Sequence, residues 1–185
     1  FEHTWFKPND YNIKPHKEFK ISHLAGKLNK TYGHGLRHEL LAREKEINKV
    51  ETNFYHTYGD RHDINNARQG KMDVFGKNMF AVAIENTNHR GYFTEKILDL
   101  FLLRSIPIYW GCSNIGDFFN LDGVIQVNNI DDIIYHSNKL NRVFYMEKKE
   151  AIEDNWNRAL KFVDYEQNIV DEITNIFKHN GILAV

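Results

Sequence analysis

The 185-residue chain lacks three features that would place it in a specialised class of protein: paired cysteines, a strong net charge and long apolar runs. Cys112 is the single cysteine, so an intrachain disulfide and a cysteine-type zinc site are both excluded. The apolar runs are far shorter than the ~20 residues that a membrane-spanning helix needs. A net charge of −1 favours neither nucleic acid nor an anionic membrane as a partner.

The remaining composition is that of a soluble globular protein, with 42% hydrophobic and 26% charged residues. No internal repeat, low-complexity segment or Ser/Gly linker divides the chain. We therefore expect one domain over residues 1–185, long enough to bury a substantial core. Because the sequence begins at Phe1 and not at Met, it is either processed at its start or part of a longer polypeptide.

Hydrophobic patterning predicts strands that alternate with helices. The segment "MFAVAIEN" is a continuous apolar run, which is typical of a strand covered on both faces. The predicted strands are Phe19–Ala25, Val50–Gly59, Met79–Asn86, Ser105–Trp110 and Gly123–Asn129. The predicted helices are Leu36–Ile47, Glu95–Leu103, Ile130–Leu140, Lys148–Phe162 and Gln167–His179, while the polar stretch Asp60–Asn78 is expected to be a loop or a short helix.

This alternation implies crossover connections, and hence an α/β fold with a doubly wound, mostly parallel, Rossmann-like sheet. Ligands of such sheets bind beyond the carboxyl ends of the strands. Two loops fall there, one after Ala25 and one from Asn86 to Phe93.

Several nucleotide and metal motifs are missing. There is no Walker loop, and His38 stands where a dinucleotide fingerprint beginning at Gly33 and Gly35 would have its third glycine. No Asp-x-Asp triplet is present to clamp a metal on a nucleotide diphosphate. His34 and His38 have an i,i+4 spacing, but His34 is expected in a loop between glycines, so we predict no metal site.

The junction "IENTNHRGYFTEKI" carries the candidate binding residues. Thr94 is a plausible N-cap, and a helix N-terminus offers free N–H groups and partial positive charge to a phosphate. Lys96 would add a full positive charge, and the Glu95 carboxylate can accept hydrogen bonds from two ribose hydroxyls. First-turn Glu and Lys residues are also common on solvated surfaces, so spacing alone leaves that role open.

Three further side chains lie at the same predicted edge of the sheet. Arg37, in the first helix, could reach a phosphate with two parallel hydrogen bonds or remain a surface arginine. Asn86 could bind a ligand or cap its own loop, and Tyr92 could pack on the same ligand.

With these residues in place, the segment "FAVAIENTNHRGYFTEKILDLFLLRSIPIYWGCSNIGDFFN" resembles the signature of the α1,3/α1,4-fucosyltransferases, glycosyltransferase family ten. The upstream stretch "KISHLAGKLNKTYGHGLRHELL" is similar to the strand, loop and arginine-bearing helix of that family. Its members have two Rossmann-like domains in a GT-B arrangement. The C-terminal domain, which this chain resembles, holds a nucleotide-sugar donor, usually GDP-fucose.

The resemblance implies a role for each candidate. Arg37 and Lys96 would neutralise the diphosphate, Glu95 would hold the ribose, and Asn86 and Tyr92 would line the donor pocket. It implies inverting transfer to a glycan hydroxyl without a metal or other cofactor. The family's general base belongs to an acceptor domain that this chain lacks, so no catalytic base is assigned.

Two alternatives stay open: a non-catalytic nucleotide-binding or interaction module with the same fold, and a transferase that uses another nucleotide sugar. The resemblance also implies an N-terminal acceptor domain as a partner. The compartment is not determined by the sequence, although a bacterial or viral origin would imply the cytoplasm.

Overall fold

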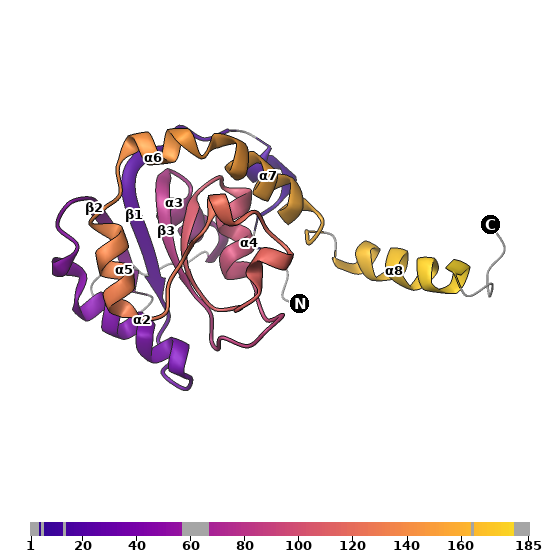
Figure 1. Cartoon of the computed structure of the whole chain (residues 1–185), viewed down its shortest axis with the longest axis horizontal. Helices are drawn as coiled ribbons and strands as arrows, with labels where there is room; N and C mark the ends of the chain where they lie inside the picture. The colour runs from indigo at the N-terminus through magenta and orange to yellow at the C-terminus, as the bar shows by residue number, and fades with distance from the viewer. Residues whose placement is uncertain (1–3, 5, 13, 57–66, 164, 180–185) are drawn as a thin grey trace.

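The computed structural model describes residues 4, 6–12, 14–56, 67–163 and 165–179. Five strands alternate with helices along this part of the chain (Figure 1). The strands are β1 (Glu18–Ala25), β2 (Glu51–His56), β3 (Asn78–Ile84), β4 (Ile106–Trp110) and β5 (Ile125–Gln126). The α-helices are α1 (Pro8–Tyr11), α2 (Tyr32–Ala42), α3 (Ala67–Phe75), α4 (Glu95–Leu102), α5 (Ile130–Ser137), α6 (Arg142–Glu147), α7 (Lys149–Leu160) and α8 (Tyr165–His179).

The strands form one sheet in the order β2-β1-β3-β4-β5, and every neighbouring pair is parallel. The predicted doubly wound α/β fold is therefore confirmed. Strand order reverses between β1 and β3, since the chain moves outward from β1 to β2 and then returns to β3 on the other side. In open parallel sheets this reversal point is where the loops separate and ligands bind.

Helices cover both faces of the sheet, which explains why β3 is apolar from Met79 to Ile84. Phe80 and Ile84 face a cluster formed with α2 and α5. Ala81 and Ala83 face a second cluster formed with α3 and α4. All seven residues of β3 are buried, so alternation places an apolar side chain on each face in turn.

Helix α2 begins four residues before the predicted start at Leu36. Thr31 is its N-cap, and the Thr31 Oγ1 accepts from the His34 backbone N–H at 3.3 Å. The His34 Nδ1 in turn accepts from the Thr31 backbone N–H at 3.2 Å, which closes a reciprocal capping arrangement. The expectation that His34 lies in a loop was wrong, because this cap carries the helix through both glycines.

Gly33 lies where α2 meets the end of β3. Its N–H donates to the Asn86 carbonyl at 3.3 Å, and a Cβ at this position would overlap the Glu85 carbonyl. A side chain here would therefore push the first turn of α2 away from the sheet. Gly35, two residues later, has open space, since its nearest neighbour would be the Asn29 Oδ1 at 3.9 Å.

We expect Gly33→Ala to lower the free energy of unfolding by about 1–3 kcal/mol, the usual cost of overpacking a close contact. Gly35→Ala is the matched control in the same helix and should stabilise the protein by about 0.5–1 kcal/mol. Urea unfolding of both variants measures the difference. Equal effects of the two substitutions would contradict the close approach of α2 to Glu85.

Helix α4 begins at Glu95 as predicted, with Thr94 as its N-cap. Seven of its eight residues are buried, and two of them, Glu95 and Asp99, are charged. The helix is thus less uniformly apolar than the sequence indicates. It ends before Arg104, whose φ of +58° turns the chain into β4.

The C-terminal third departs most from prediction. The expected strand Gly123–Asn129 is reduced to the two-residue edge strand β5. The predicted helix Ile130–Leu140 ends at Ser137, and α6 follows as a separate helix. Helix α8 extends away from the rest of the chain in Figure 1 and exposes the apolar residues Ile169, Val170, Ile173, Ile176 and Phe177.

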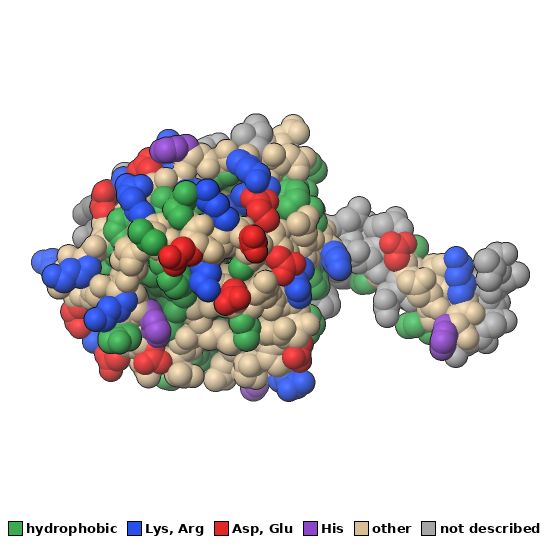
Figure 2. All heavy atoms as spheres, turned by 45° about the horizontal axis from the view of Figure 1, so that its top comes forward, with side chains coloured by type: hydrophobic (Ala, Val, Ile, Leu, Met, Phe, Trp, Pro, Cys, Tyr) green, Lys and Arg blue, Asp and Glu red, His purple; other side chains and the backbone are tan. Residues whose placement is uncertain are grey.

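The surface carries both signs of charge. On the face shown in Figure 2, acidic and basic side chains are interspersed over the main body. This distribution agrees with the net charge of −1. Among the described residues, no helix is long and apolar enough to cross a membrane.

Candidate functional site

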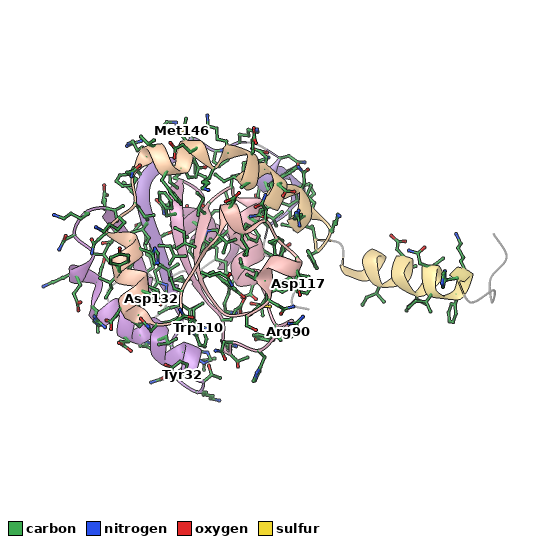
Figure 3. The ribbon with its side chains drawn as sticks, in the orientation of Figure 1. Tyr32, Arg90, Trp110, Asp117, Asp132 and Met146 are labelled. Carbon is green, nitrogen blue, oxygen red and sulfur yellow. The ribbon has the colours of Figure 1, made fainter. Side chains whose placement is uncertain are left out.

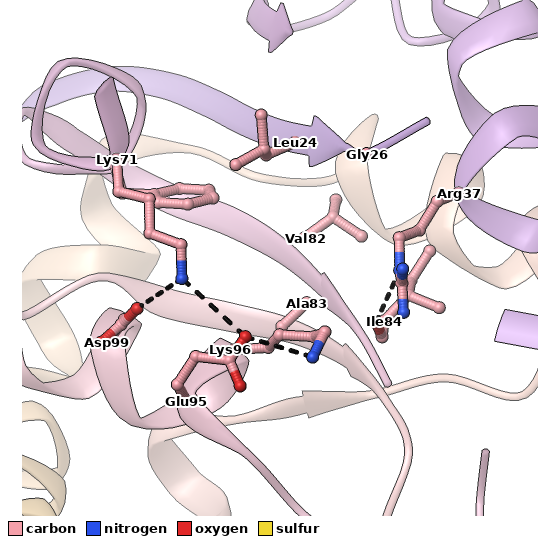
Figure 4. A pocket seen from close by; sticks show the side chains of 11 residues that line it. Leu24, Gly26, Arg37, Lys71, Val82, Ala83, Ile84, Glu95, Lys96 and Asp99 are labelled. Carbon is pink, nitrogen blue, oxygen red and sulfur yellow. Dashed lines mark hydrogen bonds and ion pairs between the residues drawn. The ribbon is translucent and has the colours of Figure 1, made fainter. Parts of the chain in front are cut away.

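A cavity of about 160 Å³ lies at the reversal point between β1 and β3 (Figure 4). Its walls come from the carboxyl ends of both strands and from the first turns or inner faces of three helices. Leu24, Val82 and Ile84 supply apolar surface, while the charged lining residues are Arg37, Lys71, Glu95, Lys96 and Asp99. Charged groups therefore converge where the topology places a ligand.

Arg37 reaches this site from α2 and is held by the end of β3. Arg37 is only 7% exposed, and its Nε donates to the Ile84 carbonyl at 2.9 Å. Its Nη2 donates to the Asn86 Oδ1. Burial lowers the pKa of Arg37, while nearby Glu85 and Glu95 oppose that shift. The guanidinium is thus a buried cation, fixed in direction by two acceptors.

Glu85 organises the loop between β3 and α4. It is fully buried, and its carboxylate accepts from the Thr94 backbone N–H at 2.9 Å and from the Thr94 hydroxyl at 2.7 Å. Lys96 Nζ lies 3.7 Å from the second carboxylate oxygen. Burial raises the pKa of Glu85, opposed by Lys96 and Thr94. The structure therefore gives Glu85 a structural role, that of holding the residue before α4.

Lys96 and Glu95 meet at the mouth of α4. Lys96 Nζ lies 3.2 Å from the Glu95 Oε1 and donates to the Thr94 hydroxyl at 3.0 Å. The Lys96 side chain is 23% exposed and that of Glu95 is 10% exposed. Both charges are therefore accessible from the cavity but are held in place by neighbours, unlike freely solvated surface residues.

Lys71 and Asp99 are members of the site that the sequence did not reveal. Lys71 Nζ lies 2.9 Å from the Asp99 Oδ2 and 3.9 Å from the Glu95 Oε1 (Figure 4). Asp99 is one helical turn after Glu95, so α4 places both carboxylates on one side. A charged residue inside an apolar helix was the available signal for Asp99. Lys71 lies in the polar stretch that the sequence predicted as a loop or a short helix, and the structure forms helix α3 there.

Asn86 and Tyr92 flank the cavity without lining it. Asn86 is half-buried and contacts Arg37 through its side-chain oxygen. Tyr92 is also half-buried, and its phenol lies near enough to Arg37 to influence the pKa of that group. The structure thus brings Arg37, Asn86, Glu95 and Lys96 together, with Tyr92 beside them.

The charges around the cavity balance. Arg37, Lys71 and Lys96 face Glu85, Glu95 and Asp99. The N-terminus of α4 adds a partial positive charge and backbone N–H groups. Groups of both charges, and the N–H groups of the first turn of α4, thus lie together at this end of the sheet.

His23 supports Arg37 from β1. It is 1% exposed, and its Nε2 lies 3.2 Å from the Arg37 carbonyl oxygen. Burial lowers the pKa of His23 to about 4, so the ring stays neutral at neutral pH. The neutral ring can then donate a hydrogen bond from Nε2 to that carbonyl.

This shift predicts a pH dependence of stability. Below pH 6.5 the unfolded chain binds a proton at His23 that the folded protein excludes until about pH 4. Stability should therefore fall by about 2 kcal/mol between pH 7 and pH 5 because of this residue. The His23→Gln substitution removes this contribution and keeps the Glu85 carboxyl group in place. Urea unfolding of the variant and of the unaltered chain at both pH values measures the difference. Identical pH slopes for the two proteins would contradict the prediction.

Comparison with known families gives a match over most of the chain. Residues 28–173 match the model of the glycosyltransferase family 10 (fucosyltransferase) C-terminal domain. An α-(1,3)-fucosyltransferase of Helicobacter pylori is 35% identical over 69 residues, which are 36% of this chain and 14% of that protein. A putative fucosyltransferase of Acanthamoeba polyphaga mimivirus is 34% identical over 68 residues, 35% of this chain and 11% of the relative.

Solved structures share the fold. A crystal structure of an α1,3-fucosyltransferase superposes with a TM-score of 0.55 at 20% identity, over 75% of this chain and 38% of that one. A second structure, described as an α1,3-fucosyltransferase with GDP-fucose, superposes with a TM-score of 0.54 at 21% identity. The match covers 75% of this chain and 39% of that one. The chain thus spans less than half of the length of these relatives. On the match of residues 28–173, the chain belongs to glycosyltransferase family 10, the fucosyltransferases, and contains the C-terminal domain of that family.

Proposed function

We propose that the chain binds GDP-fucose at the cavity between β1 and β3 and presents it for fucosyl transfer to a glycan hydroxyl. The observation that supports this most is the convergence of Arg37, Glu95 and Lys96 at the reversal point of the sheet. Membership of the fucosyltransferase family agrees with it, as does the described binding of GDP-fucose by a solved relative.

In this proposal the diphosphate lies between Arg37 and Lys96. Both are cations, and the first turn of α4 adds N–H donors to the same place. Lys96 now contacts Glu95 at 3.2 Å, so it would exchange that contact for a phosphate oxygen. Glu95 would then accept hydrogen bonds from the two ribose hydroxyls. Asn86 and Tyr92 would close the pocket beside Arg37.

The same cations would assist the chemistry. As the acceptor oxygen bonds to the anomeric carbon, the bond from that carbon to the β-phosphate breaks, and GDP departs with the electron pair. Arg37 and Lys96 would stabilise the charge that develops on GDP. We assign no general base, and we propose that the hydroxyl proton is taken by a group supplied by an acceptor domain.

This division of labour needs no metal, and metal independence is part of the proposal. Two other functions would use the same cavity. A non-catalytic module would bind the nucleotide without turnover, and a different transferase would prefer another nucleotide sugar.

The test is calorimetric titration of the unaltered chain with GDP, GDP-fucose and ADP in the presence of EDTA. We expect GDP and GDP-fucose to bind and to raise the melting temperature, since a ligand at 100 times its Kd adds about 2.7 kcal/mol of stability. Binding that requires Mg²⁺ would contradict metal independence. No binding of either guanine nucleotide would overturn the proposed function.

Turnover separates the remaining functions. GDP release from GDP-fucose, with or without a glycan acceptor, would support an enzyme. Tight binding without GDP release would favour the non-catalytic module. Tighter binding of another GDP-sugar than of GDP-fucose would reassign the donor.

A further inference from the structure

The loop from Glu85 to Thr94 controls the direction of the two cations at the cavity. Near its start, Asn86 accepts a hydrogen bond from Arg37, and at its end the Thr94 hydroxyl accepts one from Lys96 Nζ at 3.0 Å. Glu85 bonds to the Thr94 backbone and hydroxyl at 2.9 and 2.7 Å, so the two ends of the loop are tied to each other. A shift of this loop would therefore move the acceptors that orient both cations.

Asn114, in the turn that follows β4, holds the middle of the same loop. Its Oδ1 accepts from the Gly91 backbone N–H at 2.7 Å and lies 3.2 Å from the Cys112 thiol. Its Nδ2 donates to the Asp117 Oδ2 at 2.7 Å. Asp117 also pairs with Arg90 at 3.3 Å, and Figure 3 shows these two residues beside one another. Both halves of the Asn114 amide are thus used, one on the loop and one on its own segment.

The backbone at Gly91 is not fixed by its own surroundings. Gly91 has a φ of +74°, and a Cβ at this position would meet nothing within 4 Å. Glycine adopts left-handed and right-handed conformations about equally, so its own preference does not select this bend. The hydrogen bond from Asn114 therefore supplies a restraint that packing around Gly91 does not.

Phe93 secures the end of the loop by packing and does not involve Asn114. Its side chain is buried, and its ring lies 4.9 Å from that of Phe118 and 5.5 Å from that of Phe119, between centroids. Because Phe93 directly precedes the N-cap of α4, the start of that helix stays in place when the Asn114 contact is lost. Loss of this contact should therefore loosen the middle of the loop and leave the fold intact.

We propose that Asn114 is a positioning residue for nucleotide binding, an inference that rests on the proposed function. Asn114 does not line the cavity between β1 and β3, and it acts through Gly91 on the loop that directs the two cations. A loop already held in its binding conformation loses less conformational freedom when the ligand arrives, which raises affinity. Without the contact, only those molecules that have the loop in place bind, and the observed Kd rises in proportion.

Asn114→Ala should weaken the binding of GDP about fivefold in calorimetric titration, the usual effect of one lost hydrogen bond. The Gly91 amide hydrogen should also exchange faster in the unliganded protein, because its acceptor is gone. Asn141→Ala is the matched control, since the Asn141 Oδ1 likewise accepts a backbone N–H, that of Phe144 at 2.8 Å, at the start of α6. This control should lower the melting temperature similarly and leave the Kd of GDP within twofold.

An exchange of side chains between positions 114 and 117 separates positioning from stability. Asn114→Asp alone keeps an acceptor for Gly91 but sets a second carboxylate against Asp117, so it should weaken GDP at least as much as Asn114→Ala. The double variant Asn114→Asp/Asp117→Asn restores a donor opposite an acceptor and keeps the net charge. It should return the Kd of GDP to within twofold of that of the unaltered chain.

The outcomes distinguish this inference from the proposed function. If Asn114→Ala binds GDP as tightly as the unaltered chain, the inference fails while the proposed function stands. The same holds if the double variant binds GDP as weakly as Asn114→Asp, or if Asn141→Ala weakens GDP as much as Asn114→Ala does. If the unaltered chain binds neither GDP nor GDP-fucose, the proposed function fails and this inference fails with it.

Discussion

Lys96→Ala should weaken the binding of GDP about 100-fold. A hydrogen bond to a charged group contributes about 1.5–3 kcal/mol, and in the proposed complex Lys96 is bonded to a phosphate in a site with limited water access. Its side chain is 23% exposed and already held by Thr94 and Glu95, so little ordering is needed on binding. Isothermal titration calorimetry with GDP measures the loss.

The control for this prediction is Lys148→Ala. Lys148 has a similar side-chain exposure of 29% and pairs with Asp122, and neither residue lines the cavity between β1 and β3. GDP should bind this variant as it binds the unaltered chain. If Lys96 binds phosphate, guanosine, which has no phosphate, should bind Lys96→Ala and the unaltered chain with the same Kd. Retention of GDP affinity in Lys96→Ala would remove Lys96 from the site.

Asp99→Ala should lower the free energy of unfolding by about 3–5 kcal/mol, the usual effect of removing one partner from a buried ion pair. The Asp99 side chain is 1% exposed and that of Lys71 is 14% exposed, with 2.9 Å between the charged atoms. The substitution leaves the Lys71 ammonium in a poorly solvated place without this acceptor. Urea unfolding at pH 7 measures the change.

The double variant Lys71→Met/Asp99→Leu tests whether charge is the cause. With both charges removed and their volume kept, most of the lost stability should return. If Asp99→Ala costs less than 1 kcal/mol, the pair behaves as an exposed salt bridge and its burial is refuted. If the double variant is no better than the single one, packing and not charge explains the loss.

The sequence predicted the centre of the fold well because each central element can be recognised from the pattern of its own residues. β3 is apolar from Met79 to Ile84, and α4 starts where Thr94 can cap it. Both features depend on neighbours in sequence, so they can be recognised without a structure. Glu95 and Lys96 stand at the predicted start of α4, so the sequence could place them at the edge of the sheet, where they line the cavity.

The parts that were missed depend on distant contacts. Two glycines in four residues indicate a loop, yet both lie in α2, and Gly33 is needed there because a Cβ would overlap the Glu85 carbonyl of a distant segment. Lys71 pairs with Asp99, which is 28 residues away in the sequence, and no local sequence pattern can predict a contact between such distant residues. The apolar segment around β5 looks like a full strand, but it pairs only with β4 and has two residues in regular geometry.

The order of the strands also decides how firmly each part of the site is held. β3 is buried throughout and is paired on both sides, so its amides should be among the last in the chain to exchange with solvent. Glu85 and Asn86 continue directly from it. β5, at the edge and with two residues in regular geometry, should exchange early. A nucleotide held at Arg37 and Lys96 would thus rest on the most persistent strand of the sheet, and hydrogen exchange should slow most in the less persistent loop from Glu85 to Thr94 when GDP is added.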